Sequence, residues 1–224
     1  MEDIFKNIDG IEFFASQRGS NDNDLIPEAL ESERPQNFEN YSKERKIEFL
    51  MGRHCAEKAL KKLYGCKSYF VGVKKDRSPI WPPGVIGSIT HNKNWVLSCV
   101  ASNKRMKGVG VDIESTLRIK ALKNIESKIL VEEEKALGVS LKKEISPQDF
   151  LSLVFSSKEA LFKCLYPICQ TFFYFKDAEI ICVDTVGKEF TFRLKRDLGE
   201  IKKGALFKGH YKKIDNDLLT LVTA

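Results

Sequence analysis

The sequence predicts a mixed α/β (α+β) fold in which one structural unit occurs twice. The two copies are expected to be related by a pseudo-two-fold axis. Two long stretches, residues 43–64 and 147–167, place apolar side chains at helical spacing. Shorter stretches with the alternation of strands occur in both halves. We therefore expect each half to be a small, mainly antiparallel sheet packed on one long helix.

The two predicted helices also share a short sequence pattern. Residues 57–64 and 159–166 have Glu, Lys, Leu and Tyr at the same four places. A duplication of this kind divides the chain into halves 1–104 and 105–224. It would put a cleft between two like halves, which is a favoured place for a ligand. The shared pattern is short, so chance similarity is the alternative.

The first helix begins after Ser42, an acceptable N-cap, and ends at Gly65, a common stop signal. Arg45 and Arg53 are eight residues apart, so they lie on nearly the same side of this helix, two turns apart. Basic residues on a helix most often form a solvated face. The preceding 40 residues are weakly patterned, with one strand starting near Ile11.

A strand over residues 69–73 is followed by a segment, 79–84, whose Pro, Trp and Gly residues predict a rigid loop. A clear strand follows at 95–101. Several side chains near the loop offer hydrogen-bond donors and positive charge, and together they would make a phosphate cradle. These candidates are Arg77, Ser88, Thr90 and His91. The alternative is that His91 is a structural loop histidine.

The stretch 108–114 predicts a strand that carries acids on one face. The apolar residues Val109, Val111 and Ile113 alternate, which places Asp112 and Glu114 together on the opposite face. Mg²⁺ is commonly held by one or two carboxylates together with waters and phosphates. A lone Asp-x-Glu is more often the solvated face of a half-buried strand, so other residues must support the metal hypothesis.

The second half is predicted to contain two helices and a β-rich end. A helix is expected over 117–137, with Glu132–Glu134 as a solvated acidic face. The helix that opens at Pro147 is expected to end at Pro167. Four strands are then expected, over residues 178–183, 189–194, 205–211 and 218–223.

The helix from Pro147 carries Lys158, Glu159 and Lys163. Glu159 and Lys163 are four residues apart, so an ordinary surface ion pair is one interpretation. In the other, Glu159 joins Asp112 and Glu114 as a third acid at a metal, while Lys158 and Lys163 neutralise a bridged pyrophosphate. Three acids, two lysines and an upstream cradle suit phosphoryl-type transfer, in which positioning and charge neutralisation dominate.

Composition narrows the class of protein. The net charge of +6 arises from 37 basic and 31 acidic residues, without the long Lys/Arg runs of a nucleic-acid tail. Such a surface suits phosphate-bearing cofactors or an acidic protein partner. The six cysteines form no Cys-x-x-Cys pair. We see no signal peptide and no apolar run of membrane-span length, and expect a cytoplasmic protein.

The chain resembles the 4′-phosphopantetheinyl transferases, particularly the branch typified by enterobactin synthetase component D. Together the matching blocks span about residues 45–167, and the set is far more specific than Asp-Ile-Glu alone. In chain order the blocks are Arg45-x-x-Glu48-Phe49-x-x-Gly52-Arg53, Arg77-x-Pro79-x-Trp81-Pro82-x-Gly84-x-x-Gly87-Ser88-Ile89-Thr90-His91, Gly110-Val111-Asp112-Ile113-Glu114 and Phe155-Ser156-x-Lys158-Glu159-Ala160-Leu161-x-Lys163-x-x-Tyr166-Pro167.

The resemblance implies transfer of the phosphopantetheine arm of coenzyme A to a serine of an acyl, aryl or peptidyl carrier protein, with release of 3′,5′-ADP. It implies one monomeric, pseudo-dimeric catalytic domain, with the active site in the cleft between a coenzyme-binding half (1–104) and a metal-binding half (105–224). The branch suggests siderophore or other secondary-metabolite synthesis. Carrier proteins are typically acidic, which suits a basic surface.

The resemblance also assigns roles to residues. Asp112, Glu114 and Glu159, with the Ile113 backbone nearby, would surround Mg²⁺, or Mn²⁺ as an alternative. Glu159, or a water that it orients, would be the base for the carrier serine, with Asp112 and Lys163 also catalytic. The residues implied to bind coenzyme A are Arg45, Arg53, Lys75, Arg77, Ser88, Thr90, His91, Asp112, Lys158, Glu159 and Lys163.

Two other functions are weighed against this one. A different Mg²⁺-dependent phosphotransfer enzyme is disfavoured because the sequence has neither a Walker-type loop nor a kinase signature. A non-catalytic module of the same fold, which binds only a carrier or a nucleotide, is the alternative of another class. The acidic residues argue against nucleic acid as the ligand, since they would repel a phosphate backbone.

Overall fold

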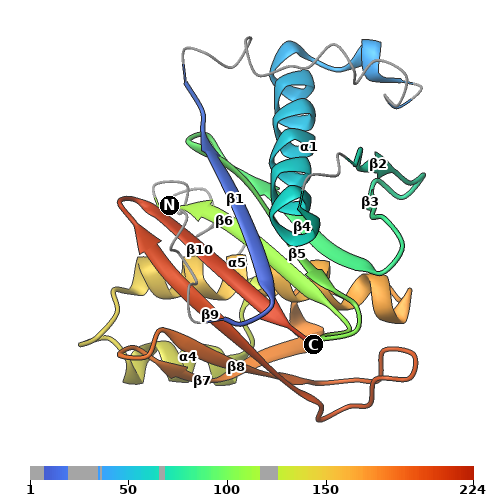
Figure 1. The fold of residues 1–224 in the computed structure, drawn as a ribbon. Helices are drawn as coiled ribbons and strands as arrows, with labels where there is room; N and C mark the ends of the chain where they lie inside the picture. The colour runs from blue at the N-terminus through green and yellow to red at the C-terminus, as the bar shows by residue number, and fades with distance from the viewer. Residues whose placement is uncertain (1–7, 20–34, 36, 66–68, 117–125) are drawn as a thin grey trace. The chain divides into compact units, whose positions relative to one another are not determined.

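The computed structural model describes residues 8–19, 35, 37–65, 69–116 and 126–224. Its internal contacts divide the chain into two compact units, Met1–Met106 (unit 1) and Lys107–Ala224 (unit 2). Each unit contains one long helix and an antiparallel sheet (Figure 1). The predicted mixed α/β fold class, with a helix packed on a small antiparallel sheet in each half, is therefore confirmed.

Unit 1 packs one helix on a sheet that has three antiparallel strands within the described residues. Its elements are β1 (Ile11–Gln17), the 3-10 turn η2 (Phe38–Asn40), α1 (Lys43–Tyr64), β2 (Gly72–Val73), β3 (Pro79–Ile80), β4 (Val85–His91) and β5 (Trp95–Ser102). The strand order is β1-β5-β4, and α1 packs against all three strands. The short strands β2 and β3 pair separately as a hairpin.

The helix α1 has the limits that its sequence predicts. The Ser42 hydroxyl accepts a hydrogen bond from the Arg45 backbone N–H, and Gly65 follows the helix with a φ of +81°. Glycine is suited to that backbone conformation because it has no Cβ. The helix buries Ala56, Ala59 and Leu60 against strand residues of the sheet, so apolar burial adds to the local signals.

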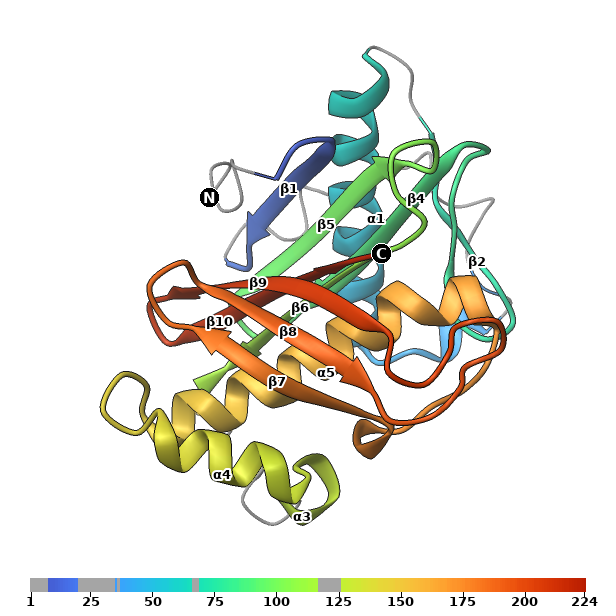
Figure 2. The same ribbon diagram turned by 90° about the horizontal axis from the view of Figure 1, so that it is seen from below.

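Unit 2 is larger and has one extensive apolar core. Its elements are β6 (Val109–Ser115), α3 (Glu126–Ile129), α4 (Glu132–Ser140), α5 (Pro147–Cys169), the 3-10 turn η5 (Phe175–Asp177), β7 (Ala178–Asp184), β8 (Glu189–Leu194), β9 (Leu206–Ile214) and β10 (Asp217–Thr223). The strand order is β6-β10-β9-β8-β7, all antiparallel. Figure 2 shows α5 along one face of this sheet, with α3 and α4 beside it.

Close contact between α5 and β6 depends on glycine. A Cβ on Gly110 would overlap the Ala160 carbonyl oxygen and lie 2.6 Å from the Cys164 backbone nitrogen. A Cβ on Gly108 would lie 2.5 Å from the Cys164 carbonyl oxygen. Only residues without a side chain let the helix backbone approach the strand this closely. The glycines therefore bring the acids of β6 next to α5.

The two units follow one topological plan. In each, the first strand and the penultimate strand flank the last strand, giving β1-β5-β4 in unit 1 and β6-β10-β9 in unit 2. The strands also align in register, since Gly87 pairs with Val100 and Gly209 pairs with Val222. The long helix follows the first strand in both units. Shared topology supports duplication over chance similarity of the two helices.

Several local predictions differ from the structure in unit 1. The expected strand 69–73 is regular only at β2, because its partner β3 is just two residues long. That partner lies within segment 79–84, which was predicted to lack regular structure. His91 was weighed as a loop histidine, but it is the last residue of β4.

The predicted helical segments of unit 2 also need correction. Within 117–137, residues 117–125 lie outside the described residues, and the remainder forms two short helices, α3 and α4. The helix α5 continues two residues past Pro167 and ends at Cys169, followed by Gln170 in the left-handed conformation. A proline lacks a backbone N–H and crowds the carbonyl four residues before it, but the residues that follow it keep their own N–H groups, so the last turn persists beyond Pro167.

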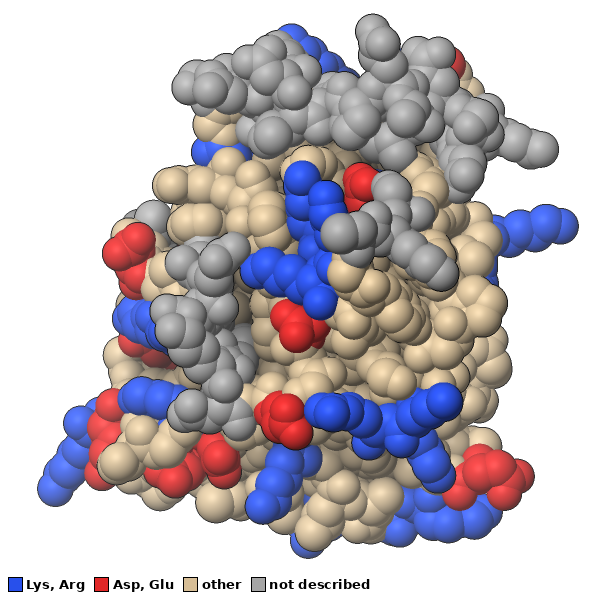
Figure 3. Space-filling view, viewed as in Figure 1, with Lys and Arg blue, Asp and Glu red and all other residues tan. Residues whose placement is uncertain are grey.

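Basic and acidic side chains lie interspersed on the face shown in Figure 3. The formal net charge of +6 is therefore not concentrated there in one block of a single sign. None of the helices in the described part of the chain combines the length and apolar character that a membrane span needs.

Candidate functional site

Unit 1 brings two of the predicted phosphate ligands together around one carboxylate. The Arg45 guanidinium (Nη1) lies 3.3 Å from Glu48 Oε2 and 3.2 Å from His91 Nε2. His91 Nδ1 is 3.6 Å from Glu48 Oε1. Arg45 and His91 remain 48% and 32% exposed at their side chains, so solvent and ligands can reach them. This arrangement can bind an anion with a guanidinium and an imidazole.

Arg18 is a third basic side chain at this cluster, and sequence reasoning missed it. Its Nη1 lies 3.3 Å from Glu48 Oε1 and donates to the Asn92 carbonyl at 3.2 Å. Arg18 directly follows β1, and its backbone N–H bonds to the Asn94 carbonyl, which extends the pairing of β1 with β5. Only that strand pairing, between segments far apart in sequence, brings Arg18 to the cluster.

Ser88 and Thr90 do not share a surface with His91. All three lie on β4, where successive side chains point to opposite faces of the sheet. Ser88 and Thr90 are buried, each 3% exposed, while His91 lies on the face of Ile89, which packs against α1. The predicted cradle is therefore divided between the two faces of one strand.

Arg53 contacts the protein backbone rather than the Arg45 cluster. Its Nε donates to the Val71 carbonyl at 3.1 Å and its Nη2 to the Gly72 carbonyl at 3.4 Å, and the guanidinium lies 4.2 Å from the Phe49 ring centroid. Burial, with the nearby charge of Arg45, lowers the pKa of Arg53 to about 10. Arg53 thus stays charged at neutral pH and ties α1 to β2.

Lys75 and Arg77 lie in the exposed turn between β2 and β3. The turn closes through hydrogen bonds from the Lys74 N–H to the Ser78 carbonyl and from the Arg77 N–H to the Lys74 carbonyl. Arg77 has a φ of +70°, a strained conformation for a residue with a side chain. The structure therefore presents both cations on a hairpin tip.

Unit 2 brings the predicted acids of β6 next to Lys163, a predicted site residue of α5. The Lys163 ammonium donates to Asp112 Oδ1 at 2.7 Å and to the Val111 carbonyl at 3.2 Å. Asp112 is 5% exposed, so its face of β6 is covered and is not the solvated face of a half-buried strand. Glu114 lies on the same face of β6 and is half-buried.

The environment of Glu159 shows that it lies near this pair. Burial and the neighbouring negative charge of Asp112 raise the pKa of Glu159, while the Lys163 ammonium opposes the rise. An acid with a raised pKa, placed beside another carboxylate, is a candidate for proton transfer or metal binding. The structure thus groups Asp112, Glu159 and Lys163 on α5 and β6, with Glu114 one alternation further along the strand.

The donor chemistry of this group fits a divalent cation. Carboxylate oxygens are the protein ligands that Mg²⁺ prefers. The position of the Lys163 ammonium, 2.7 Å from Asp112 Oδ1, shows that the surroundings of this carboxylate accommodate a positive charge. Within the described residues no three His, Cys, Asp or Glu side chains form a ready-made metal site.

Lys158 occupies a different environment from Lys163. Its ammonium is buried and donates to Glu134 Oε2 at 2.7 Å and to the Ile129 carbonyl at 2.8 Å. Burial raises the pKa of Glu134 and lowers the pKa of Lys158, and their direct contact opposes both shifts. The prediction of a solvated face over Glu132–Glu134 is wrong for Glu134, which is fully buried, because α4 turns it toward α5 and β7.

A pocket of about 350 Å³ opens beside Glu159 within unit 2. Its walls are mostly aromatic and come from α5 and the segment between α5 and β7. The lining residues are Lys158, Glu159, Leu161, Phe162, Phe172, Phe173, Tyr174, Phe175 and Ala178. Phe172 and Tyr174 are 60% and 71% exposed, so apolar surface is offered to solvent. Sequence reasoning did not single out this aromatic segment.

Comparison with known proteins identifies related sequences. The chain is 31% identical over 142 residues to 4′-phosphopantetheinyl transferase Npt of Nocardia iowensis, which covers 61% of this chain and 59% of that protein. It is 31% identical over 128 residues to enterobactin synthase component D of Escherichia coli (strain K12), which covers 56% and 57%. The chain thus spans about half the length of the curated relatives it matches.

A solved structure, holo-ACP-synthase from Plasmodium yoelii, is 22% identical and covers 53% of this chain and 94% of that one. Its TM-score to this chain is 0.41. Residues 33–101 match the 4′-phosphopantetheinyl transferase N-terminal domain, and residues 108–215 match the 4′-phosphopantetheinyl transferase superfamily. These matches span most of the sequence, and the chain belongs to the 4′-phosphopantetheinyl transferase superfamily.

Proposed function

We propose that this protein transfers the phosphopantetheine arm of coenzyme A to a serine of an apo carrier protein and releases 3′,5′-ADP. The observation that carries the proposal is the group of Asp112, Glu159 and Lys163 beside an aromatic pocket. Membership of the superfamily supports the same reaction. Acidic acyl, aryl or peptidyl carriers are the proposed acceptors, in siderophore or other secondary-metabolite synthesis.

The reaction makes one bond to phosphorus and breaks another. The serine oxygen bonds to the phosphorus that carries the pantetheine arm, and the bond from that phosphorus to the bridging pyrophosphate oxygen breaks. 3′,5′-ADP leaves with that oxygen. Glu159, directly or through a water, takes the serine proton, for which its raised pKa makes it a suitable acceptor. Lys163 neutralises charge on the pyrophosphate.

Asp112, Glu114 and Glu159, with the Ile113 backbone nearby, are the residues that would hold Mg²⁺, or Mn²⁺ in its place. A bound divalent cation supplies charge neutralisation at the pyrophosphate. The Lys163 ammonium lies 2.7 Å from Asp112 Oδ1 and shares the charge of that carboxylate. The contact supports the proposal, because it joins a proposed metal ligand to a proposed phosphate ligand.

Unit 1 is proposed to bind the phosphates on the adenosine side of coenzyme A. Arg45 and His91 are the main candidates because they are close together and reachable from solvent. Arg18 belongs to the same cluster. The other predicted contributors, which the structure places elsewhere in unit 1, are Arg53, Lys75, Arg77, Ser88 and Thr90.

The aromatic pocket supports a role for the arm of coenzyme A. Phosphopantetheine is a long chain with gem-dimethyl and methylene groups, which gain by leaving water. A pocket of about 350 Å³ with walls from Phe162 and Phe173 offers apolar surface, and Glu159 is among its lining residues. We propose that the arm lies here with its phosphate toward Glu159. The whole is proposed to act as a cytoplasmic monomer, with units 1 and 2 forming one catalytic domain.

The test is to incubate the protein with coenzyme A, Mg²⁺ and several apo carriers and to weigh the carriers by mass spectrometry. We expect a phosphopantetheine mass gain on at least one carrier, lost with EDTA and in Asp112→Ala or Glu159→Ala. Glu57→Ala, at the equivalent place of the sequence repeat in α1, is the matched control and should retain transfer. A gain that persists in both acid variants contradicts the metal assignment, and no gain on any carrier favours a binding module.

A further inference from the structure

The Lys158–Glu134 pair is the most deeply buried ion pair among the described residues, with side chains 2% and 0% exposed. Lysine and glutamate are seldom this buried unless each is fully paired. Lys158 directly precedes Glu159, the proposed base, and both line the aromatic pocket. The pair therefore lies at the proposed active site but out of solvent.

Both oxygens of Glu134 are used within unit 2. Oε2 accepts from Lys158 Nζ at 2.7 Å and from the Val131 N–H at 3.0 Å. Oε1 accepts from the Ile180 N–H at 2.9 Å. The ammonium of Lys158 donates in addition to the Ile129 carbonyl at 2.8 Å. One carboxylate thus joins α5, the start of α4 and β7.

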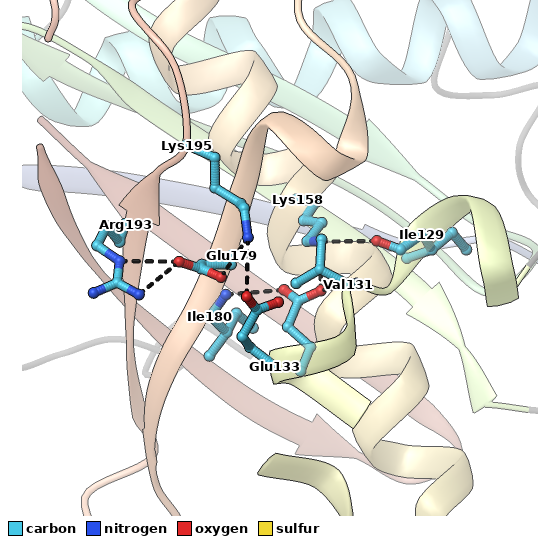
Figure 4. Close-up of polar contacts among 9 residues, drawn as sticks. Ile129, Val131, Glu133, Lys158, Glu179, Ile180, Arg193 and Lys195 are labelled. Carbon is cyan, nitrogen blue, oxygen red and sulfur yellow. Dashed lines mark hydrogen bonds and ion pairs between the residues drawn. The ribbon is translucent and has the colours of Figure 1, made fainter. Parts of the chain in front are cut away.

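A second set of ion pairs surrounds this contact at the surface. Lys195 bridges Glu133 and Glu179 at 3.4 and 3.0 Å, and Arg193 donates twice to Glu179 at 2.8 and 2.9 Å (Figure 4). These contacts connect α4 to β7 and β8, next to the buried pair. The junction between α4 and the sheet is therefore stabilised by one buried ion pair and by neighbouring ion pairs whose cations are partly exposed.

Two of the elements joined by Glu134, α5 and β7, contribute to the lining of the pocket. Glu159 and Phe162 come from α5, and the lining segment from Phe172 ends at Ala178, the first residue of β7 and two residues before Ile180. A helix rotates about 100° per residue, so Lys158 points to the side of α4 while Glu159 and Lys163 share the neighbouring face. Fixing Lys158 therefore fixes the rotation of α5 at Glu159.

We infer that Lys158 is a positioning residue and that it does not bind the pyrophosphate. Through Glu134 it fixes the position of Glu159 and of the pocket-lining segment from Phe172 to Ala178. The inference rests on the proposed function for its catalytic consequence. To reach a phosphate, the ammonium would have to leave Glu134 and Ile129, and a buried carboxylate would lose its counter-ion. Such a loss is strongly unfavourable. Lys163 differs because its side chain is 28% exposed, so a ligand can reach its ammonium while it stays beside Asp112.

The test compares Lys158→Met, Glu134→Gln and the double variant, with Lys163→Met as the matched phosphate-binding control. For each variant, the Kd for coenzyme A is measured by calorimetry and kcat by carrier mass gain. We expect Lys158→Met to lower kcat by about tenfold or more and to change the Kd by less than about twofold. The double variant should regain part of the lost kcat, because no unpaired charge remains.

Lys163→Met should instead weaken coenzyme A binding by about tenfold, without rescue by Glu134→Gln. The inference is overturned if Lys158→Met weakens coenzyme A binding as Lys163→Met does, or if the double variant is no better than Lys158→Met. It is also overturned if Lys158→Met lowers only the melting temperature and leaves kcat unchanged well below it, since the pair would then be purely structural.

Amide hydrogen exchange provides a readout that does not need activity. If Lys158 positions the pocket, Lys158→Met and Glu134→Gln should both speed exchange over residues 172–180, while Lys163→Met should not. Unchanged exchange in both variants contradicts the inference even in an inactive protein. Absence of transfer by the unaltered protein contradicts the proposed function instead, so the two failures are distinguishable.

Discussion

The two units have the same topology but opposite chemistry at one equivalent position. Phe14 of β1 pairs with Ser98, and Asp112 of β6 pairs with Thr220, and these partners take equivalent places in β5 and β10. Phe14 packs in an apolar cluster and has the Lys62 ammonium 5.6 Å from its ring centroid. Asp112 accepts a hydrogen bond from a helix lysine. The same strand position therefore holds an apolar side chain that packs in the core of unit 1 and an acidic side chain that pairs with a lysine in unit 2.

The positively charged side chains of the two units differ in how far they are exposed to solvent. Arg45 of unit 1 is about half exposed and contacts Glu48 and His91 at distances of 3.2–3.3 Å, so an anionic ligand can compete for it. Lys158 of unit 2 is buried against Glu134. Residue type alone therefore does not identify a phosphate ligand, because burial decides whether a cation serves a ligand or the fold.

The largest expected effect is at the position that distinguishes the units. Asp112→Asn should lower kcat/KM for transfer by about a thousandfold, because it removes the negative charge of a proposed metal-binding carboxylate. Phe14→Leu, at the equivalent place of unit 1, should change it by less than about threefold. Steady-state kinetics with an apo carrier measure both. Comparable losses in the two variants would remove the functional distinction between the units.

The close contact of α5 with β6 predicts a large effect on stability. Gly110→Ala should destabilise the protein by about 3 kcal/mol, since the added methyl overlaps the helix backbone at Ala160. In unit 1, Glu12 occupies the corresponding place of β1, because Glu12 pairs with Val100 as Gly110 pairs with Val222. Denaturant unfolding provides the measurement.

Gly72→Ala is the control for Gly110→Ala, because a methyl there meets only the side chain of Ile80, whose nearest atom, Cδ1, is 3.4 Å away. It should cost less than about 1 kcal/mol. If both variants are equally stable, the helix can move away from β6, and the contact at Gly110 is not what holds the acids beside α5.

The exposed cluster of unit 1 predicts an intermediate effect on binding. Arg45→Gln should weaken coenzyme A binding by about tenfold, through loss of a charge-assisted hydrogen bond. Glu48→Gln should tighten binding or leave it unchanged, since a competing carboxylate is removed from Arg18, Arg45 and His91. Calorimetry at two salt concentrations tests this. Lys61→Gln, an exposed α1 residue, is the control, and an equal loss there would indicate only a general charge effect.

The smallest expected effect comes from the raised pKa of Glu159. The folded protein binds the Glu159 proton more tightly than the unfolded chain, so ionisation of Glu159 costs stability as pH rises through its folded pKa. Glu159→Gln should therefore raise the melting temperature near neutral pH, by a few degrees at most, in metal-free protein. The gain should vanish at pH below the ordinary glutamate range. A gain independent of pH would contradict this origin.

Local sequence patterns were sufficient for the elements that surround the site. Ser42 and Gly65 limit a helix through their own backbone hydrogen bonding and conformation, and α1 has those limits. Alternation placed Asp112 and Glu114 on one face of β6, as the structure has them. These features depend on residues within a few positions of one another, so the sequence by itself determined them, together with the family and the duplicated fold.

Tertiary structure alone decided which charged residues act together. Arg18 reaches Glu48 only because β1 pairs with β5, and Glu134 reaches Lys158 only because α4 packs against α5 and β7. In sequence, Glu134 was one of three consecutive acids with nothing to distinguish it. Glu134 differs from Glu133 because it is buried against elements distant in sequence. Burial removes water from its carboxylate, which then needs a protein partner. No local pattern encodes that requirement, because it comes from segments brought together by the fold.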